Sequence, residues 1–201
     1  MDRSELVELH YIVPIENLPS ILSEGILCHR DAAKIEHSSV AMADVQTTRS
    51  TVKLPNGRVL HSYANLYFNA RNTMMYLRQG LHESVGVLSL SVEVLDLDGV
   101  VIADCNAAAV GWTQFGSPGE ILPTLAHDEI FARSWNHDDY YKKRRHKARM
   151  CAEVLVPDGV PPELINGIHV SGEPAKAAVV ATGSAIKTKI NPYLFFRGEP
   201  L

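Results

Sequence analysis

The segment KKRRHKARMCAEVLVP, residues 142–157, joins a basic run to an apolar run and decides how the chain is interpreted. Residues 142–149 are dense in positive charge, and Glu153 then opens an apolar, strand-like run that ends at Pro157. A carboxylate at the start of a strand, directly after a basic helix, can face bound polyphosphate or nucleic acid. The alternative is a solvated surface glutamate. These residues alone do not separate the two, so the rest of the chain has to decide.

The size and charge of the chain limit the classes of protein to which it can belong. Its 201 residues favour a single domain over residues 1–201, which is long enough to bury a substantial core. The hydrophobic fraction of 46% is ordinary for a globular protein. The net charge of −4 excludes the overall basic field of many nucleic-acid binders. Any anion binding must therefore be local, and residues 142–149 are the obvious place.

Cysteine and histidine usage argues against a disulfide scaffold and against a metal site. Cys28, Cys105 and Cys151 are widely spaced and form no CxxC pair, which favours a reducing compartment. The nine histidines have no metal-ligand spacing and HExxH is absent, so we expect no metal. No apolar run reaches the ~18 residues of a membrane span, and the N-terminus lacks a signal-peptide pattern. We expect a cytoplasmic protein with no membrane partner.

Short strands and helices are mixed along the chain. We expect strands at residues 6–13, 64–68, 85–94, 100–103, 153–156, 168–170 and 177–181. We expect helices at residues 14–22 (stopped by Gly25), 72–79, 121–135 and 138–149. Residues 28–57 read as a long irregular segment, with a turn at 54–57. Because the elements do not alternate as regular βαβ units, the pattern favours an α+β fold.

The first candidate binding residues lie at the end of the first expected strand. The phosphate-cradling motifs GxGxxG and GxxxxGK[ST] are absent. His10 and Tyr11, with Ile12 and Asn17 after them, can hydrogen-bond a ribose hydroxyl or an amide while a ring stacks on a heterocycle. The alternative is a pair of core residues with satisfied hydrogen bonds. Both interpretations stay open on these residues alone.

Two arginines are further candidates. Arg49 closes the run Gln46-Thr-Thr-Arg49 in the irregular segment and can donate two parallel hydrogen bonds to a phosphate. Arg71 stands where an aromatic strand runs into a helix, and helix N-termini attract anions. Tyr76 lies on that same helix. A solvated loop arginine is the alternative for Arg49, whereas a functional role is favoured for Arg71 and Tyr76.

The basic run is the candidate nucleic-acid contact. Tyr140 and Tyr141 come directly before it, so stacking aromatics lie beside charges that neutralise phosphate, a combination that suits single-stranded DNA. The DNA-binding candidates are Tyr140, Lys142, Lys143, Arg144, Arg145 and Lys147. The six lysines and arginines of residues 142–149 cannot all face one way on a helix. Some of them therefore form a solvated face, and His146 fits either side.

Taken in order, four segments resemble the DarT family of bacterial toxins, which are DNA ADP-ribosyltransferases. They are HYIVPIENLPSILSEGIL at residues 10–27, HSSVAMADVQTTR at 37–49, ANLYFNARNTMMY at 64–76, and the basic helix followed by AEVLVP at 152–157. The resemblance covers about residues 8 to 180, and its specificity lies in the order and spacing of the segments. It implies the ADP-ribosyltransferase fold, an α+β split β-sandwich with flanking helices and with NAD in the cleft.

The resemblance also implies roles for individual residues. Glu153 matches the essential catalytic glutamate, and Arg49 matches an arginine that contacts NAD and is implicated in catalysis. His10, Tyr11 and Ile12 match the NAD pocket. The commoner family pattern reads Tyr-His-Ile-Thr, so here Tyr11 takes the usual histidine place. Residues 73–76 read Thr-Met-Met-Tyr where the family often has Pro-Met-Leu-Tyr. Which of His10 and Tyr11 contacts the nicotinamide ribose therefore stays open.

The function implied by the resemblance is that of the toxin in a toxin–antitoxin system. Such an enzyme transfers ADP-ribose from NAD to a thymine or guanine of single-stranded DNA and releases nicotinamide. NAD is the co-substrate, no metal is required, and the antitoxin partner is a macrodomain protein of the DarG type. Two other functions are weighed against it: an NAD-dependent transferase that acts on RNA or protein, and a non-catalytic nucleic-acid-binding module. Consumption of NAD distinguishes the enzymes from the module.

Overall fold

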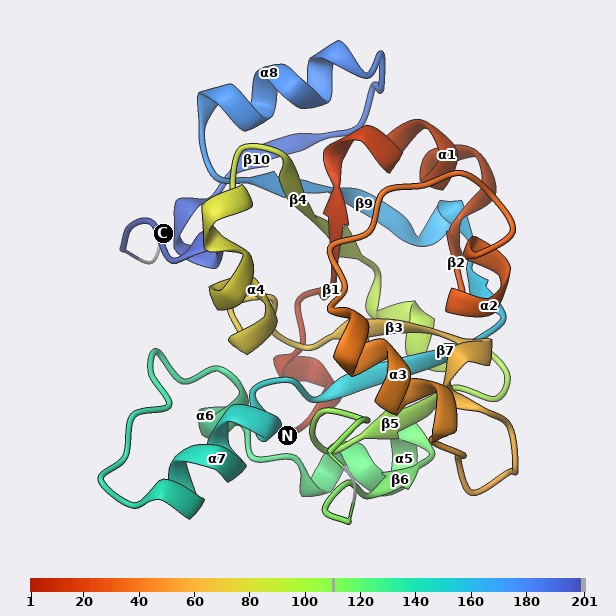
Figure 1. The fold of residues 1–201 in the computed structure, drawn as a ribbon, viewed down its shortest axis with the longest axis vertical. Coiled ribbons are helices and arrows are strands. Elements are labelled where there is room, and N and C mark those ends of the chain that lie inside the picture. Colours follow the sequence, from red (N-terminus) through yellow and green to blue (C-terminus); the bar gives the residue numbers. More distant parts are fainter. Residues whose placement is uncertain (110, 200–201) are drawn as a thin grey trace.

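The computed structural model describes residues 1–109 and 111–199 and is built around one large sheet (Figure 1). Its eight strands have the order β10-β9-β4-β1-β3-β7-β5-β6, and β2 and β8 form a separate small ladder. Neighbours are antiparallel except for β10 and β9, which are parallel. The strands are β1 (Leu9–Pro14), β2 (Ile26–Leu27), β3 (Tyr63–Tyr67), β4 (Val85–Leu90), β5 (Val101–Ala103), β6 (Phe115–Gly116), β7 (Glu153–Pro157), β8 (Gly159–Val160), β9 (Ile165–Val170) and β10 (Thr188–Ile190).

The sheet divides into two halves between β1 and β3. β1 pairs with β4 along its whole length, and β3 does the same with β7. Between β1 and β3, in contrast, the described register holds the single pair His10↔Tyr67. Tyr67 in turn pairs with Glu153, the first residue of β7. Beyond His10 and Tyr67 the two strands diverge, and this divergence creates the space for a site. The α+β fold with a split sheet is therefore confirmed.

Helices surround the sheet, with α8 above it and α6 and α7 at the opposite end in Figure 1. The α-helices are α1 (Leu18–Glu24), α2 (His29–Ala32), α3 (Ala43–Thr51), α4 (Thr73–Arg78), α5 (Pro118–Ile121), α6 (His127–Ile130), α7 (Tyr140–Arg149) and α8 (Glu173–Ala181). Short 3-10 helices link them, at Arg3–Glu5, Ile15–Asn17, Leu60–Ser62, Gln79–Leu81, Val92–Asp96, Leu122–Thr124, Pro162–Leu164 and Pro192–Phe195. The main core forms where Leu9, Leu66, Leu88 and Val154 point to the same side of adjacent strands and are fully buried.

Several expected boundaries are confirmed because local chemistry sets them. Gly25 ends α1 with φ 85°, and a Cβ there would lie 2.2 Å from the Val160 carbonyl oxygen. The turn at residues 54–57 is closed by a hydrogen bond from the Gly57 N–H to the Leu54 carbonyl. The Asn72 side chain caps α4 by accepting from the Met74 and Met75 amides, and Asp139 caps α7 through the Lys142 amide.

The expectation of an irregular segment at residues 28–57 is wrong over α2 and α3. α3 carries no apolar stripe, because the residue that it buries is Arg49. A helix that turns a cation inward shows no amphipathic pattern, so periodicity cannot reveal it. The first strand is also shifted, since β1 begins at Leu9 rather than at residue 6.

Three further expectations are corrected. Residues 121–135 do not form one helix, because Pro123 lies in a 3-10 turn that separates α5 from α6. Residues 177–181 belong to helix α8, which buries Ala175 and Val179 four residues apart, a helical rather than a strand spacing. The strand at 85–94 stops at Leu90, where the Ser91 side chain caps a 3-10 turn. In the described residues, no helix is long and apolar enough to cross a membrane.

Candidate active site

An ion pair between Arg49 and Glu153 is the centre of the site. Arg49 comes from α3 and Glu153 from the start of β7, 104 residues apart. Nη1 lies 3.0 Å from Oε1 and Nη2 lies 2.9 Å from Oε2, so the guanidinium grips the carboxylate with two parallel hydrogen bonds. The backbone amide of Ala107 donates a third, 3.0 Å long, to Oε1. Both carboxylate oxygens therefore have charged or dipolar partners.

This pair is almost entirely withdrawn from solvent. The side chain of Glu153 is 0% exposed and that of Arg49 is 7% exposed. Burial works against the charge of Arg49, but the Glu153 carboxylate outweighs it and the pKa of Arg49 is raised above its ordinary value. Burial and the nearby Glu153 charge raise the pKa of the Tyr67 hydroxyl well above its ordinary value. The interpretation of Glu153 as a solvated surface glutamate is thereby excluded.

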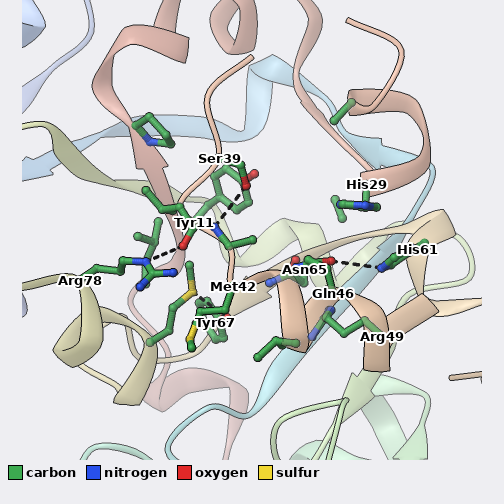
Figure 2. Close-up of a pocket in the computed structure, with 18 of the residues that line it drawn as sticks. Tyr11, His29, Ser39, Met42, Gln46, Arg49, His61, Asn65, Tyr67 and Arg78 are labelled. Carbon is green, nitrogen blue, oxygen red and sulfur yellow. Dashed lines mark hydrogen bonds between the residues drawn. The ribbon is translucent and has the colours of Figure 1, made fainter. Parts of the chain in front are cut away.

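A pocket opens above the pair, where β1 and β3 diverge. It holds about 220 Å³ of space and combines apolar walls with amide, hydroxyl, imidazole and guanidinium groups. Figure 2 shows Tyr11, Met42, Asn65 and Tyr67 around this space, with Arg49 and Arg78 on different sides of it. The lining includes Tyr11, Ile12, Asn17, His29, Ser39, Met42, Gln46, Arg49, His61, Asn65, Tyr67, Thr73, Arg78, Asn106 and Cys151.

The loop at residues 37–42 forms one wall of the pocket and is anchored at two points. The Asn17 side chain donates to the Ser38 carbonyl at 2.7 Å and accepts from the Ser38 amide at 3.1 Å. The Arg78 Nε donates to the Val40 carbonyl at 2.6 Å. Because both anchors come from elements that flank the pocket, the loop is held against the cavity rather than free in solvent.

Two histidines stack at the side of the pocket. The rings of His29 and His61 have centroids 4.0 Å apart, and the His61 Nε2 lies 3.1 Å from the Gln46 side-chain oxygen. Burial lowers the pKa of both, and each is lowered further by the charge of Arg49; His29 also lowers that of His61. Both rings therefore favour the neutral form, which can donate or accept a hydrogen bond but carries no charge.

A second cavity, here called the basic groove, lies between α3 and α7. Its lining consists of Asp44, Val45, Thr48, Thr73, Asn106, Ala108, Ala109, Arg144, Lys147 and Ala148. Val45, Thr73 and Asn106 also line the pocket, so the two cavities meet at these residues. Asn106 immediately precedes Ala107, the amide partner of Glu153. The buried ion pair thus lies beside the junction of the pocket and the groove.

The basic helix α7 divides its charges between two faces, as expected. Arg144 and Lys147 face the basic groove, and the Arg144 guanidinium lies 4.8 Å from the centre of the Trp112 ring. On the other side, Arg149 pairs with the Glu129 carboxylate. The His146 Nε2 lies 2.9 Å from the Glu129 carbonyl, so His146 belongs to this second face. Tyr140, Lys142 and Arg145 are exposed, and Lys143 is half-buried.

The structure brings four of the predicted cofactor-binding residues to the pocket and leaves three outside it. Tyr11, Ile12, Asn17 and Arg49 line the pocket. His10 does not line the pocket, and its ring contacts Glu8 and the Phe68 carbonyl. The sequence alone does not decide whether His10 or Tyr11 contacts the nicotinamide ribose. Of the two, Tyr11 is the one that lines the pocket.

Arg71 and Tyr76 belong to an aromatic cluster that joins α4 to Tyr193 and Phe196. The Arg71 guanidinium lies 4.5 Å from the Tyr193 ring centre and 4.1 Å from that of Phe196, and it donates to the Arg133 carbonyl. Tyr76 packs edge-on against Phe196. Burial lowers the pKa of Arg71. Both residues thus support the contact of α4 with the C-terminal segment, and neither lines the pocket.

Sequence reasoning missed several residues of the pocket. His29, His61, Asn65, Arg78 and Asn106 line it and lie in five different elements or loops. Their positions depend on tertiary packing and carry no local signal. Gln46 is different, because it precedes Arg49 by three residues and a helix at this segment would place both on one face.

Comparisons with known proteins identify the family to which the chain belongs. A family model described as DarT, ssDNA thymidine ADP-ribosyltransferase, matches residues 10–196. A DNA ADP-ribosyl transferase–DNA ADP-ribosyl glycohydrolase fusion protein of Thermosipho africanus is 35% identical over 173 residues. That match covers 82% of this chain and 42% of the fusion protein, so the chain spans less than half of its relative. A DNA ADP-ribosyl transferase of Thermus sp. is 28% identical to this chain, and the match covers 82% of that relative.

Solved structures of proteins from Thermosipho africanus and Thermus sp. share the fold. Thermosipho africanus DarTG in complex with ADP-ribose has a TM-score of 0.81 at 30% identity and covers 94% of this chain, which spans 51% of that chain. Thermus sp. 2.9 DarT in complex with ADP-ribosylated ssDNA has a TM-score of 0.81 at 25% identity, with 95% and 97% coverage. The NAD+ complex of that protein matches at 23% identity and supports the fold alone. This chain therefore belongs to the DarT family, described as ssDNA thymidine ADP-ribosyltransferases.

Proposed function

We propose that the protein transfers ADP-ribose from NAD to a thymine base of single-stranded DNA and releases nicotinamide. The observation that carries this proposal is the buried Arg49–Glu153 pair beside the junction of a pocket and a basic groove. A reaction between two large substrates needs two access routes that meet at one reactive centre. The family description supports thymine, and the relatives solved with ADP-ribose and with ADP-ribosylated ssDNA support both substrates.

The pocket suits NAD as the co-substrate. Arg78 offers positive charge to the pyrophosphate, and Asn65 and Gln46 offer amide groups to ribose hydroxyls. Tyr11 and Met42 supply flat or apolar surface to the two heterocycles. Pockets for cofactor-sized ligands commonly combine apolar walls with a few placed polar groups. We assign Tyr11, rather than His10, to the nicotinamide end.

Glu153 would stabilise the charge that develops on the ribose. The C–N bond between nicotinamide and the ribose breaks, and its electron pair leaves with nicotinamide. The sugar carbon then resembles an oxocarbenium ion, and a buried carboxylate nearby stabilises that positive charge far better than water does. The bond from the base nitrogen to that carbon forms on the opposite side, and the base loses a proton. Arg49 holds the carboxylate in place through two parallel hydrogen bonds.

The basic groove would hold the DNA strand. Arg144 and Lys147 face it and can neutralise phosphates, while the exposed Tyr140 on the same helix offers a stacking surface. Lys142, Lys143 and Arg145 would add charge on the approach to the groove. An unpaired strand delivers its base without the unstacking cost, a few kcal/mol, that duplex DNA imposes.

The chain is further proposed to act as the toxin of a toxin–antitoxin pair, as a single DarT-like domain over residues 1–201 in the cytoplasm. The Thermosipho relative joins its transferase to a DNA ADP-ribosyl glycohydrolase in one polypeptide. A macrodomain glycohydrolase of the DarG type is accordingly the partner we assign, because it would remove the modification that this chain adds.

The test is an acceptor series. The protein is incubated with NAD and with single-stranded oligonucleotides that contain only one type of base, with duplex DNA, with RNA and with protein. Mass spectrometry of the products then identifies the acceptor. Modification confined to thymine-containing single strands is expected. Modification of guanine would change the base that we assign as acceptor, and modification of RNA or protein would change the substrate class. If no NAD is consumed, the protein is a nucleic-acid-binding module rather than an enzyme.

A further inference from the structure

Three polar side chains gather on the sheet outside the proposed active site. Glu8 precedes β1, His10 lies on β1 and His169 on β9, with Ser89 of β4 beside them. The ligating atoms of Glu8, His10 and His169 all lie within 4.8 Å of one another. Both histidines are buried, whereas the Glu8 side chain is 24% exposed. The cluster therefore has an enclosed floor and an opening to solvent through Glu8.

The two histidine rings converge on the same carboxylate oxygen. The His10 Nε2 lies 3.1 Å from the Glu8 Oε1, and the His169 Nε2 lies 2.8 Å from that same atom. Ser89 donates its hydroxyl to the other oxygen. A carboxylate oxygen that two imidazole nitrogens approach from different strands has the donor set of a three-ligand metal site.

Both ring nitrogens of His10 face hydrogen-bond acceptors. Its Nδ1 lies 3.2 Å from the Phe68 carbonyl oxygen, while its Nε2 faces the Glu8 carboxylate. Both partners can only accept hydrogen bonds, whereas a neutral imidazole donates from one nitrogen. A metal ion on Nε2 resolves this conflict, because Nδ1–H then donates to the carbonyl. Metal-binding histidines are commonly oriented by such a bond from their second nitrogen.

We infer that Glu8, His10 and His169 form a binding site for a divalent transition-metal ion, with Zn²⁺ as the preferred occupant. Imidazole nitrogens and a carboxylate oxygen are ligands that Zn²⁺ accepts. Tetrahedral Zn²⁺ with bonds of ~2.1 Å holds its ligand atoms about 3.4 Å apart. The distances of 3.1 Å and 2.8 Å would have to open by about 0.3 Å and about 0.6 Å to reach this separation. Water completes the coordination from the open side.

The ion would stabilise the fold rather than take part in the transfer of ADP-ribose. His169 and His10 lie on β9 and β1, on either side of β4, and His10 also provides the described register pair between the two halves of the sheet. Through Tyr67, that row of paired residues continues to Glu153. A metal that fixes His10 would therefore stabilise the junction of the two halves, and it would link residues 161 positions apart in the chain.

The test is a titration of the chelator-treated, full-length protein with Zn²⁺, followed by calorimetry and by the rise in Tm. One Zn²⁺ per chain is expected, with no competition from an excess of Mg²⁺ or Ca²⁺. Co²⁺ should give the visible absorption of a site with nitrogen ligands. His10→Gln and His169→Gln should weaken Zn²⁺ binding at least about tenfold. The matched control is His137→Gln, since His137 and His146 form a second histidine pair, 2.8 Å apart, on the surface.

Three results would overturn the site. Wild-type protein that takes up no stoichiometric Zn²⁺ would identify the cluster as a hydrogen-bond network without a metal. Unchanged binding in folded His10→Gln and His169→Gln would place the ion elsewhere, and loss of binding in His137→Gln would place it at the surface pair. Circular dichroism verifies that each variant folds, and the wild-type titration decides the question without any variant. None of these measurements depends on transfer activity.

Discussion

Helices α3 and α7 both line the basic groove, yet they use their cations in opposite ways. α3 (Ala43–Thr51) buries Arg49 against Glu153, whereas α7 (Tyr140–Arg149) buries no residue and presents Arg144 and Lys147 to the groove. Neither helix has an apolar stripe. Two hydrogen bonds and burial hold the Arg49 guanidinium of α3 in place. The charges that α7 presents to the groove, on Arg144 and Lys147, are exposed to solvent.

The difference between the two helices lies in solvent screening. A charge pair withdrawn from water acts at short range with a large energy, and the loss of one partner leaves the other buried and unpaired. Exposed charges interact weakly with each other, and salt screens them. Chemistry on a ribose requires a buried charge pair of fixed geometry. Capture of a polyanion requires exposed charges. We therefore expect substitutions on the two helices to differ in kind as well as in size.

The largest expected effect is on catalysis by Glu153→Gln. The amide has nearly the shape of the carboxylate and can still accept from the Ala107 N–H, but it offers no negative charge to the developing oxocarbenium ion. We expect the single-turnover rate to fall about 10³-fold, the scale of losing one electrostatic stabiliser. NAD affinity should change far less. A rate within tenfold of wild type would remove Glu153 from the chemistry.

The next effect is on stability. Arg49→Ala leaves the Glu153 carboxylate buried without its partner, and the free energy of unfolding should fall by about 3–5 kcal/mol. Arg145→Ala, at an exposed position on α7, should change it by about 0.5 kcal/mol or less. Urea titrations of both variants measure this contrast. Equal losses would show that burial does not distinguish the two helices.

A smaller effect is expected on DNA binding. Arg144→Gln with Lys147→Gln removes the two cations that face the groove, and Lys142→Gln with Arg145→Gln removes two exposed ones. The slope of log K against log salt for a single strand should flatten by about 0.7 for each lost phosphate contact. The first pair should flatten it more than the second. Unchanged slopes in both double variants would mean that α7 is only a solvated face.

The smallest effect is on the pH dependence of stability. Burial and the charge of Arg49 lower the pKa of His29 and of His61 in the folded protein. The unfolded chain then binds more protons, so the stability that these rings contribute is present above their ordinary pKa of about 6.5 and is lost as the pH falls below it. His29→Gln and His61→Gln should reduce the loss of unfolding free energy between pH of about 7.5 and about 5.5. An identical loss in both variants contradicts this account.

The sequence predicts much of this arrangement where local chemistry decides it. Gly25, Asn72 and Asp139 mark the ends of helices through backbone and side-chain preferences that act within a few residues. The order of the motifs points to Arg49 and Glu153, and the family match bears out the resemblance. The division of the charges on α7 follows from helical periodicity alone.

The remaining features depend on contacts between distant segments. The Ala107 amide reaches Glu153 because the end of β5 pairs with the start of β7 at Ala103 and Glu153, and nothing around residue 107 indicates this pairing. α3 is invisible to periodicity because its inward residue is charged. We expect no metal from the sequence because the histidines lack ligand spacing along it. That spacing does not reveal that His169 lies beside Glu8 in the fold.

The role of Glu153 in transfer is tested by the mass of a thymine-containing single-stranded oligonucleotide after incubation with NAD and the protein. Wild type should add one ADP-ribose to the strand, and Glu153→Ala should add none at a temperature at which its circular dichroism shows a folded protein. Glu120→Ala, at an exposed carboxylate that caps α5, is the matched control and should modify the strand as wild type does. Comparable modification by wild type and Glu153→Ala would contradict the account.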